Sequence, residues 1–502
     1  ARAGAGWRGI QWTVAVLLLA GCAAGCLMEE LACEVDEDYP LKLNCSVLLS
    51  NATSGVLDVT VTYSATDIAD GPVLRVDLPA SSGEAVSFSL YRLAPGNTYQ
   101  ITATASDPAQ SCSDTAYATT GLTGDEEMDN GPLVSMNRTA QSTLDLVVYD
   151  RQAKYVAFDR TGWAVWYLDT GSPMTPQPSF CRTQHPDYTV SALLNYTMAR
   201  YTPDNKLVSI LDIPCYPQNR SMINHECTAS SDSPYEVYTF QQAIIPDATT
   251  EDGWPIVTQI LSLWDAEQNV YTELCKTTEL FDPATQKGPM SSAKYPSNCP
   301  GDAANAGQTL HTIDWSHDNT LTVSNDPTKL TLSSRHLSAI ASIERDGSGL
   351  DWFISTEIEG EYSVPVVEDR WYNQHYVHEL ANGNYLMLDN GNDRPDKSVG
   401  SRALEITIDH ETKTASAVWE FVPGITTMHA GVVKDLGTGT RLVAFSCDVI
   451  ADDYDCDMLL WEVDASTGDV VTTANLPRSA PNSIGSYRAE PMDSINGEVV
   501  VG

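Results

Sequence analysis

From about residue 132 to the end of the chain, short runs that favour β-strands alternate with turn residues, and no persuasive long amphipathic helix interrupts them. A weak repeat recurs here: a strand, a turn with Asp or Arg and usually Gly, and a strand that carries Trp. Four examples occupy residues 158–166, 343–352, 408–419 and 461–470. Several such units over about 370 residues favour a β-propeller of four-stranded blades. A sandwich or barrel with ordinary hairpins is the alternative.

The first part of the chain carries a different β pattern. Residues 56–63 and 99–105 alternate apolar and polar side chains, as half-buried strands do, and residues 93–99 form a turn into the second of these runs. This pattern and the segment's size favour an immunoglobulin-like or fibronectin type III-like sandwich over residues 27–122. A polar, acidic linker over residues 123–131 precedes the propeller expected over 132–502. The fold class expected is therefore all-β.

The N-terminus has the layout of a secretory signal peptide over residues 1–26. Arg2 and Arg8 supply positive charge, an apolar run over residues 12–20 follows, and small residues come next. That run is too short to span a bilayer comfortably. Residues 19–22 also resemble a bacterial lipoprotein box, in which Cys22 would carry a lipid anchor; a plain cleavable signal is the alternative. In both cases we expect an extracytoplasmic protein: secreted, periplasmic or membrane-anchored.

The chain has 12 cysteines, ten of them beyond the expected signal. An exported chain with so many thiols is expected to pair most of them. Cys33 and Cys45 can pair with each other or with Cys112, and Cys447 and Cys456 are close enough to close one loop. No tight Cys/His cluster accompanies them, so no metal site is expected. Asn-x-Ser/Thr sequons, which carry glycans only in a eukaryotic secretory pathway, open at Asn44, Asn51, Asn137, Asn195 and Asn219.

The charge balance excludes some partners. The chain has 28 Lys and Arg against 67 Asp and Glu, a formal net charge of −39. Nucleic acids and anionic membrane surfaces are therefore not expected as partners, because both are bound mainly by clustered Lys and Arg. Solubility in an extracellular medium accounts for the acidity. No feature of the sequence indicates an oligomeric state.

The nine histidines are the candidates for proton or group transfer, because imidazole titrates near neutral pH. Those that carry motifs lie in residues 314–336 and 373–391, and residues 401–405 follow. In these segments the chain resembles the arylsulfotransferase family, whose members take sulfate from a phenolic sulfate ester instead of a nucleotide.

The resemblance is close over about residues 305–421 and looser over 132–304 and 422–502. Each piece is weak alone, but their ordered set is specific. The matching pieces are Asp314-x-x-His317-x-Asn319, Leu332-Ser-Ser-Arg335, Gln374-His375, Leu380-x-Asn-Gly-Asn384, Leu388-Asp-Asn-Gly391, Ser401-Arg402-Ala403 and the closing Tyr487-Arg488-Ala489.

The resemblance implies a six-bladed propeller behind a small β-domain, and no cofactor. It also implies a ping-pong reaction between a phenolic sulfate donor and a phenolic acceptor, in which His375 attacks sulfur and becomes a sulfohistidine. His317, Asn319 and Arg335 would surround the transferring group. His225 falls where the family places a further active-site histidine.

These residue types suit the implied chemistry. A neutral imidazole is a competent nucleophile near pH 7, and two displacements each have a lower barrier than one. A guanidinium offers paired donors to the charged sulfuryl oxygens. A second imidazole can protonate the departing phenoxide and later deprotonate the acceptor.

Other nearby residues have a structural interpretation. His336, His378 and His429 are expected to serve the sheets, and Arg402 suits a salt bridge as well as it suits the site. Residues 215–220 resemble a sulfatase Cys-x-Pro-x-Arg motif, but the Arg lies one position too far along the chain.

Residues 202–245 depart from the family pattern, with two Cys and a Ser-rich stretch where a clearer His and Asn-Gly-Asn segment is common. Two alternatives therefore stay open. One is a catalytically silent propeller that binds glycans or proteins at a cell surface. The other is a hydrolase that passes the sulfuryl group to water.

Overall fold

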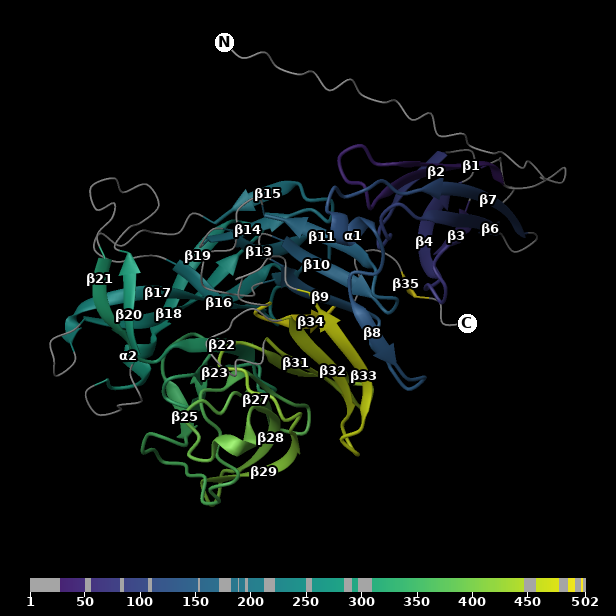
Figure 1. The fold of residues 1–502 in the computed structure, drawn as a ribbon. Coiled ribbons are helices and arrows are strands. Elements are labelled where there is room, and N and C mark those ends of the chain that lie inside the picture. Colours follow the sequence, from purple (N-terminus) through teal and green to yellow (C-terminus); the bar gives the residue numbers. More distant parts are fainter. Residues whose placement is uncertain are drawn as a thin grey trace, which may run out of the picture. The chain divides into compact units, whose positions relative to one another are not determined.

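The computed structural model describes most of the chain, and its strands form antiparallel sheets with very little helix (Figure 1). The chain divides into two compact units, one of Ala1–Pro132 with Trp163–Trp166 and Ser494–Gly502, the other of Leu133–Gly162 and Tyr167–Asp493. Within the described part of the chain, no helix is long and apolar enough to cross a membrane. The described residues are 28–49, 56–81, 85–106, 111–151, 154–170, 182–187, 189–194, 197–211, 222–249, 255–283, 291–296, 309–446, 457–477, 486–492 and 498–499.

The first unit contains two sheets that share one hydrophobic core. One sheet has the order β1 (Met28–Val35), β2 (Leu43–Leu49), β5 (Ala85–Leu90). The other has the order β35 (Glu498–Val499), β4 (Leu74–Ser81), β3 (Val56–Ala65), β6 (Thr98–Ser106), β7 (Ser111–Thr119). Burial alternates along β6, as its apolar–polar pattern predicts, and its inward side chains cluster with those of β2.

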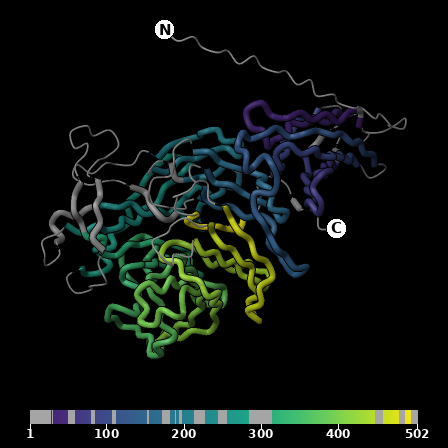
Figure 2. Tube along the Cα trace, in the orientation of Figure 1, coloured from purple at the N-terminus to yellow at the C-terminus, as the bar shows by residue number. Residues whose placement is uncertain are grey.

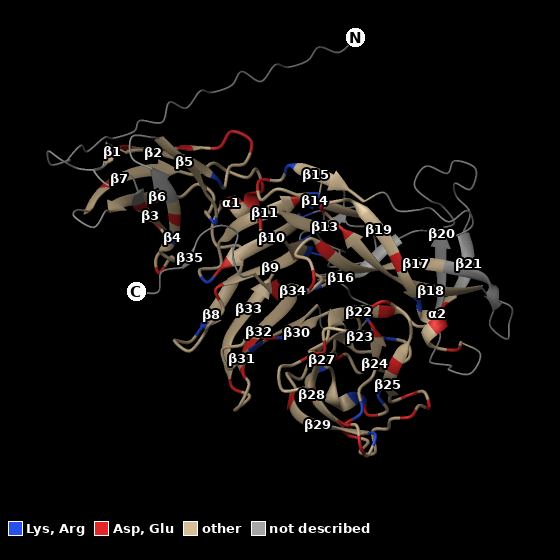
Figure 3. Cartoon of the chain, turned by 180° about the vertical axis from the view of Figure 1, so that it is seen from behind, with Lys and Arg blue, Asp and Glu red and all other residues tan. Residues whose placement is uncertain are grey.

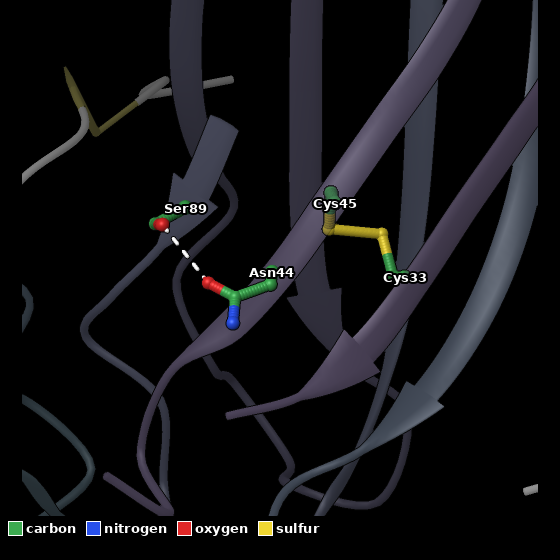
Figure 4. The surroundings of a disulfide bond; sticks show 4 residues. All are labelled: Cys33, Asn44, Cys45 and Ser89. Carbon is green, nitrogen blue, oxygen red and sulfur yellow. Dashed lines mark hydrogen bonds between the residues drawn. A yellow bond between two sulfur atoms is a disulfide. The ribbon is translucent and has the colours of Figure 1, made fainter. Parts of the chain in front are cut away.

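A disulfide crosses the first sheet between β1 and β2, where Cys33 and Cys45 are direct register partners (Figure 4). Beside it, Ser89 Oγ and Asn44 Oδ1 lie 3.1 Å apart in a hydrogen bond. Of the two pairings left open by the sequence, the structure therefore has Cys33 with Cys45. Cys112 is disulfide-bonded too, whereas Cys447 and Cys456 lie outside the described residues.

The acidic segment expected as a linker contains a short helix, α1 (Glu126–Asp129). Asp125 caps it, because its carboxylate accepts a hydrogen bond from the backbone N–H of Glu127. Acidic side chains are spread over both units, and Lys and Arg are fewer (Figure 3).

The second unit is a series of sheets of four or more strands, antiparallel apart from one parallel pair, β18 (Pro255–Asp265) with β21 (Thr309–Asp314). Two further helical turns, α2 (Thr277–Leu280) and η1 (Lys397–Val399), lie in connections. Two sheets have the orders β11 (Ala164–Asp169), β10 (Lys154–Asp159), β9 (Leu146–Arg151), β34 (Ala489–Pro491), and β12 (Arg182–Gln184), β13 (Val190–Leu194), β14 (Thr197–Tyr201), β15 (Leu207–Ile210). A larger sheet has the order β16 (Met222–Ala229), β17 (Glu236–Thr249), β18 (Pro255–Asp265), β21 (Thr309–Asp314), β20 (Ser291–Pro296), and β19 (Val270–Lys276) also pairs with β18.

The remaining three sheets follow along the chain. Their orders are β22 (Asp318–Val323), β23 (Lys329–Ser334), β24 (Ala339–Glu344), β25 (Leu350–Ser355); β26 (His375–Glu379), β27 (Tyr385–Asp389), β28 (Arg402–Asp409), β29 (Thr414–Phe421); and β30 (Val432–Asp435), β31 (Thr440–Phe445), β32 (Met458–Asp464), β33 (Val470–Leu476), β8 (Ser135–Arg138).

The outer hairpins of several sheets share one turn. In each, the Asp that ends the inner strand accepts a hydrogen bond from the backbone N–H two residues later, and a residue with positive φ closes the turn. These pairs are Asp159 with Gly162, Asp265 with Asn269, Asp409 with Lys413, and Asp464 with Gly468. Three of the four predicted examples, over residues 158–166, 408–419 and 461–470, thus contain this Asp-turn hairpin, whereas the turn within 343–352 follows Glu344 and uses Asp346 with Gly347.

The end of the chain returns to the start of the second unit. β33 pairs with β8 and β34 pairs with β9, so the yellow C-terminal strands run beside the blue early ones (Figure 2). Asp150 on β9 accepts hydrogen bonds from Ser486 Oγ and from the backbone N–H groups of Tyr487 and Arg488. This carboxylate therefore fixes the closing segment before β34.

Candidate active site

His375 is the first residue of β26, and its ring has a defined hydrogen-bonding state. Asn390 Nδ2 donates to the carbonyl oxygens of Thr427, at 3.0 Å, and Ala430, at 3.2 Å. Its Oδ1 is therefore left to accept from His375 Nδ1, 2.6 Å away. The imidazole carries its proton on Nδ1, so the lone pair lies on Nε2. The His375 side chain is buried, with only 2% of the residue exposed.

The loop over residues 427–431 faces that lone pair. The Ala430 backbone N–H donates to His375 Nε2 at 3.3 Å. Ala430 has φ of 63° and Gly431 has φ of 99°, so both lie in the left-handed region. A Cβ on Gly431 would also lie within 2.2 Å of the Leu388 side chain, so glycine is required there. Ser401 anchors the loop, because its Oγ accepts from the Thr427 backbone N–H.

His317 precedes β22 and is paired with a carboxylate. Its Nδ1 lies 2.5 Å from Asp314 Oδ2, and its φ of 47° turns the chain sharply before the strand. The His336 ring packs on it with centroids 4.7 Å apart, and His336 Nδ1 donates to the Asp314 carbonyl oxygen. Burial, aided by the charge of His317, lowers the pKa of His336 to about 3. His336 is therefore neutral at pH 7, and His317 is the imidazole with a carboxylate partner.

Arg335 follows β23 and is almost completely buried. Its Nη2 donates to the Met428 carbonyl oxygen at 3.2 Å, while its Nε has no hydrogen-bond partner among the described residues. Burial lowers the pKa of the guanidinium, and the charge of Asp314 opposes that effect. Met428 and Ala430 belong to one loop, so the side chains of Arg335 and His375 contact the same short stretch of backbone.

Asn319 is enclosed by the backbone next to His375 and is not exposed. It is fully buried, its Nδ2 donates to the Gln374 carbonyl oxygen at 2.7 Å, and its Oδ1 accepts from Thr320 Oγ1. Gln374 Nε2 in turn donates to Ser333 Oγ and to the Ala339 carbonyl oxygen. Asn319 therefore positions the backbone that carries His375.

His429, which the sequence interpretation assigned to a structural role, lies in the loop over residues 427–431 beside the candidate site. Its ring is half-buried, and burial, followed by the charges of Arg335 and His317, lowers its pKa to about 4. Its carbonyl oxygen is fixed by Thr427 Oγ1 and Ser446 Oγ. No local motif marks His429; the signal was its position before Ala430-Gly431.

Two other histidines are placed differently. His225 lies on β16 at the register shift between Asn224 and Cys227, but its side chain is outside the described part of the structure. His378 follows His375 on β26, its Nδ1 has no hydrogen-bond partner among the described residues, and burial lowers its pKa to about 3. Arg402 forms salt bridges with Asp389, 2.9 Å away, and with Glu420, so its role is structural.

The backbone around the site is strained at several non-glycine residues. His317, Asn373, Tyr376 and Ala430 have φ values between 47° and 63°, a region that costs such residues free energy. Each lies where a strand begins or a loop turns beside His375 or Arg335. At these positions the direction of the side chains is fixed at a cost in backbone conformational energy.

Among the described residues, Asp314, His317 and His336 could hold a metal ion, because their ligand atoms lie within 4.8 Å of one another, a grouping that the sequence spacing did not reveal. Two hydrogen bonds already join these residues: His317 Nδ1 with Asp314 Oδ2, and His336 Nδ1 with the Asp314 carbonyl oxygen, which is not one of the ligand atoms. The three residues form a hydrogen-bonded cluster, which suits proton transfer.

Comparisons with curated proteins and with solved structures give no close match. No curated protein matches significantly. Among solved structures, a protein of unknown function from Bacteroides caccae is 9% identical, over 70% of this chain and 100% of its own, with a TM-score of 0.43. Hydrazine synthase of Kuenenia stuttgartiensis is 12% identical, over 62% and 68%, with a TM-score of 0.31. Similarities this weak carry no argument.

The family model for Arylsulfotransferase (ASST) matches residues 125–488, well over half of the chain. The match includes every residue of the candidate site, from His225 to Tyr487, and every motif quoted for the resemblance up to Arg488. The chain belongs to the arylsulfotransferase family.

Proposed function

We propose that this protein is an exported sulfotransferase that moves a sulfuryl group from a phenolic sulfate ester to a phenolic acceptor through a sulfohistidine at His375. The observation that carries the proposal is the tautomer of His375. Asn390 holds the proton on Nδ1, so the nucleophilic lone pair on Nε2 faces the loop that also holds Arg335.

In the first displacement, His375 Nε2 forms a bond to sulfur while the bond from sulfur to the phenolic oxygen breaks. The departing phenoxide takes a proton from His317, whose Nδ1 is paired with Asp314. The sulfated ring then carries positive charge, and the hydrogen bond from its Nδ1–H to Asn390 Oδ1 becomes stronger.

In the second displacement the acceptor phenol gives its proton to His317. Its oxygen attacks sulfur, and the sulfur–nitrogen bond breaks to restore neutral His375. Both steps concentrate negative charge on the sulfuryl oxygens, and the buried guanidinium of Arg335 is the group that stabilises it. Asn319 contributes by fixing the Gln374–His375 backbone.

The proposed framework for this chemistry is a six-bladed propeller over residues 132–502, behind an immunoglobulin-like or fibronectin type III-like domain over 27–122. The sheets of the second unit and the pairing of its last strands with its first support a closed ring of blades. Disulfides such as Cys33–Cys45 support export through a signal over residues 1–26, with or without a lipid on Cys22.

The test is release of 4-nitrophenol from 4-nitrophenyl sulfate, with and without added phenol. We compare the wild type with His375→Ala and with His410→Ala, a matched control whose ring bonds Tyr362 in a distant hairpin. Release that needs both phenol and His375, and that survives in the control, supports the proposal. Release without an acceptor would identify a hydrolase, and no release from folded protein would identify a binding propeller.

A further inference from the structure

A cluster of charged and aromatic side chains lies next to His375. Tyr376 follows His375 on β26, Lys434 is on β30, and Arg488 and Glu490 are at β34. Lys434 Nζ lies 3.6 Å from Glu490 Oε2, and Arg488 Nη1 lies 3.4 Å from Glu490 Oε1. Three strand segments that are distant in sequence therefore meet in this cluster, and two of its cations pair with one carboxylate.

Two tyrosines connect this cluster to the nucleophile. The Arg488 guanidinium lies 4.5 Å from the centroid of the Tyr376 ring and 5.5 Å from that of Tyr487. The Tyr487 ring is 6.1 Å from the His375 ring, edge to face. Aromatic rings thus link the reacting imidazole to the cations, and such rings can pack against an aryl substrate.

Cations outnumber carboxylates where the described side chains interact. Arg182 on β12 is a third cation, because its charge acts on both Lys434 and Glu490. Burial opposes ionisation of Glu490, but the charges of Lys434, Arg488 and Arg182 hold its pKa below its usual range. The pKa of Lys434 is raised, chiefly by Tyr376, so its ammonium stays protonated.

Other charged groups near the cluster already form salt bridges or hydrogen bonds with other residues. Arg441, which acts on the neighbouring His378, pairs with Glu405 in a salt bridge. Asp150, which holds the Arg488 backbone, accepts from Ser486 Oγ and two backbone N–H groups. The carboxylates of Glu405 and Asp150 are therefore paired with groups other than Lys434.

Lys434 differs from the buried arginines because it remains reachable. Its side chain is 34% exposed, against 15% for Glu490 and 0% for Arg488. A lysine side chain that stays partly exposed beside aromatic rings can accept a ligand.

We propose that Lys434 and Arg488 form a subsite for a second anionic group, a carboxylate or sulfonate, on the aryl substrate whose phenolic oxygen reacts at His375. This inference rests on the proposed function and names the substrate class: phenols that carry an acidic substituent. In a chain with a net charge of −39, such a subsite would offset the general repulsion of anions.

The experiment compares 4-hydroxybenzoate with 4-hydroxybenzamide, an uncharged acceptor of nearly the same shape. In Lys434→Met, the ratio of kcat/KM for the acid over the amide should fall about tenfold, the effect of losing one charge-assisted contact. Lys434→Arg should restore most of the ratio. Lys413→Met, at an exposed lysine paired with Glu361, is the matched control and should leave the ratio as in the wild type. An unchanged ratio in Lys434→Met overturns the subsite.

A binding measurement separates this inference from the reaction itself. Benzoate is titrated calorimetrically into the wild-type chain and the Lys434→Met variant without any sulfate donor. Binding that is about tenfold weaker in the variant supports the subsite even if the wild type transfers nothing, in which case only the proposed function fails. Equal binding, or no binding to either protein, refutes the subsite while transfer to phenol can still stand.

Discussion

The tautomer of His375 can be tested by removing the amide that sets it. Asn390→Ala takes away the acceptor for His375 Nδ1–H and leaves a donor buried without a partner. Such a group costs about 1–3 kcal/mol, and the ring can escape this cost by moving its proton to Nε2, where it blocks the attack. Because each 1.36 kcal/mol is tenfold in rate, kcat/KM should fall about 5- to 150-fold.

The assay is steady-state transfer from 4-nitrophenyl sulfate to phenol, with circular dichroism to confirm folding. Asn390 also anchors the loop at residues 427–430, so a control must loosen that anchor and leave the bond to His375 intact. Ser401→Ala does so, since Ser401 Oγ bonds the Thr427 backbone. If kcat/KM falls no further in Asn390→Ala than in Ser401→Ala, loosening of the loop explains the loss and the tautomer argument is refuted. Asn390→Asp should restore activity over Asn390→Ala, because a carboxylate also accepts from Nδ1–H.

Two further predictions concern buried charges. Arg335→Lys should lower kcat/KM at least tenfold, mainly through kcat, because an ammonium lacks the paired donors that stabilise charge in the transition state; an effect confined to KM would contradict this role. Asp318 is fully buried, and burial raises the pKa of its carboxyl to about 6 despite hydrogen bonds from Ser334 and Thr277. Since the folded state favours the protonated form, the wild type should lose about 3 kcal/mol of stability as pH rises from about 3 to 7. Urea unfolding should show this loss relative to Asp318→Asn, and parallel pH profiles of the two proteins would disprove it.

The β class and the hairpin repeat could be predicted because both follow from local chemistry. An Asp that bonds the backbone two residues later, followed by a residue that tolerates positive φ, specifies a tight turn whatever surrounds it. The β18–β19 hairpin uses the same turn, although the predicted examples did not include it. The order of the sheets was not predictable, since pairing of β34 with β9 joins the two ends of the unit.

The site was partly predictable for a similar reason. Arg335, His317 and His375 lie in motifs whose residues are neighbours along the chain, and the loop at 428–430 connects two of them in space. His429 sits in that loop with no motif of its own, so only the fold reveals it. Asn319 was singled out with them, and its contact with the Gln374 carbonyl indicates a positioning role in the proposed site.

The choice between phenol and water as acceptor depends on the same loop. His375 Nε2 is capped by the Ala430 N–H, so a donor must displace that contact before sulfur can approach. The proposed donor, packing on the surface that leads to Tyr487, supplies the contact area to shift the loop. In the proposed intermediate the sulfuryl group occupies Nε2, which releases the Ala430 N–H to bind a sulfuryl oxygen beside Arg335. An aromatic acceptor can use the same surface in the second displacement and a water molecule cannot, so we expect this loop to favour transfer to a phenol over hydrolysis.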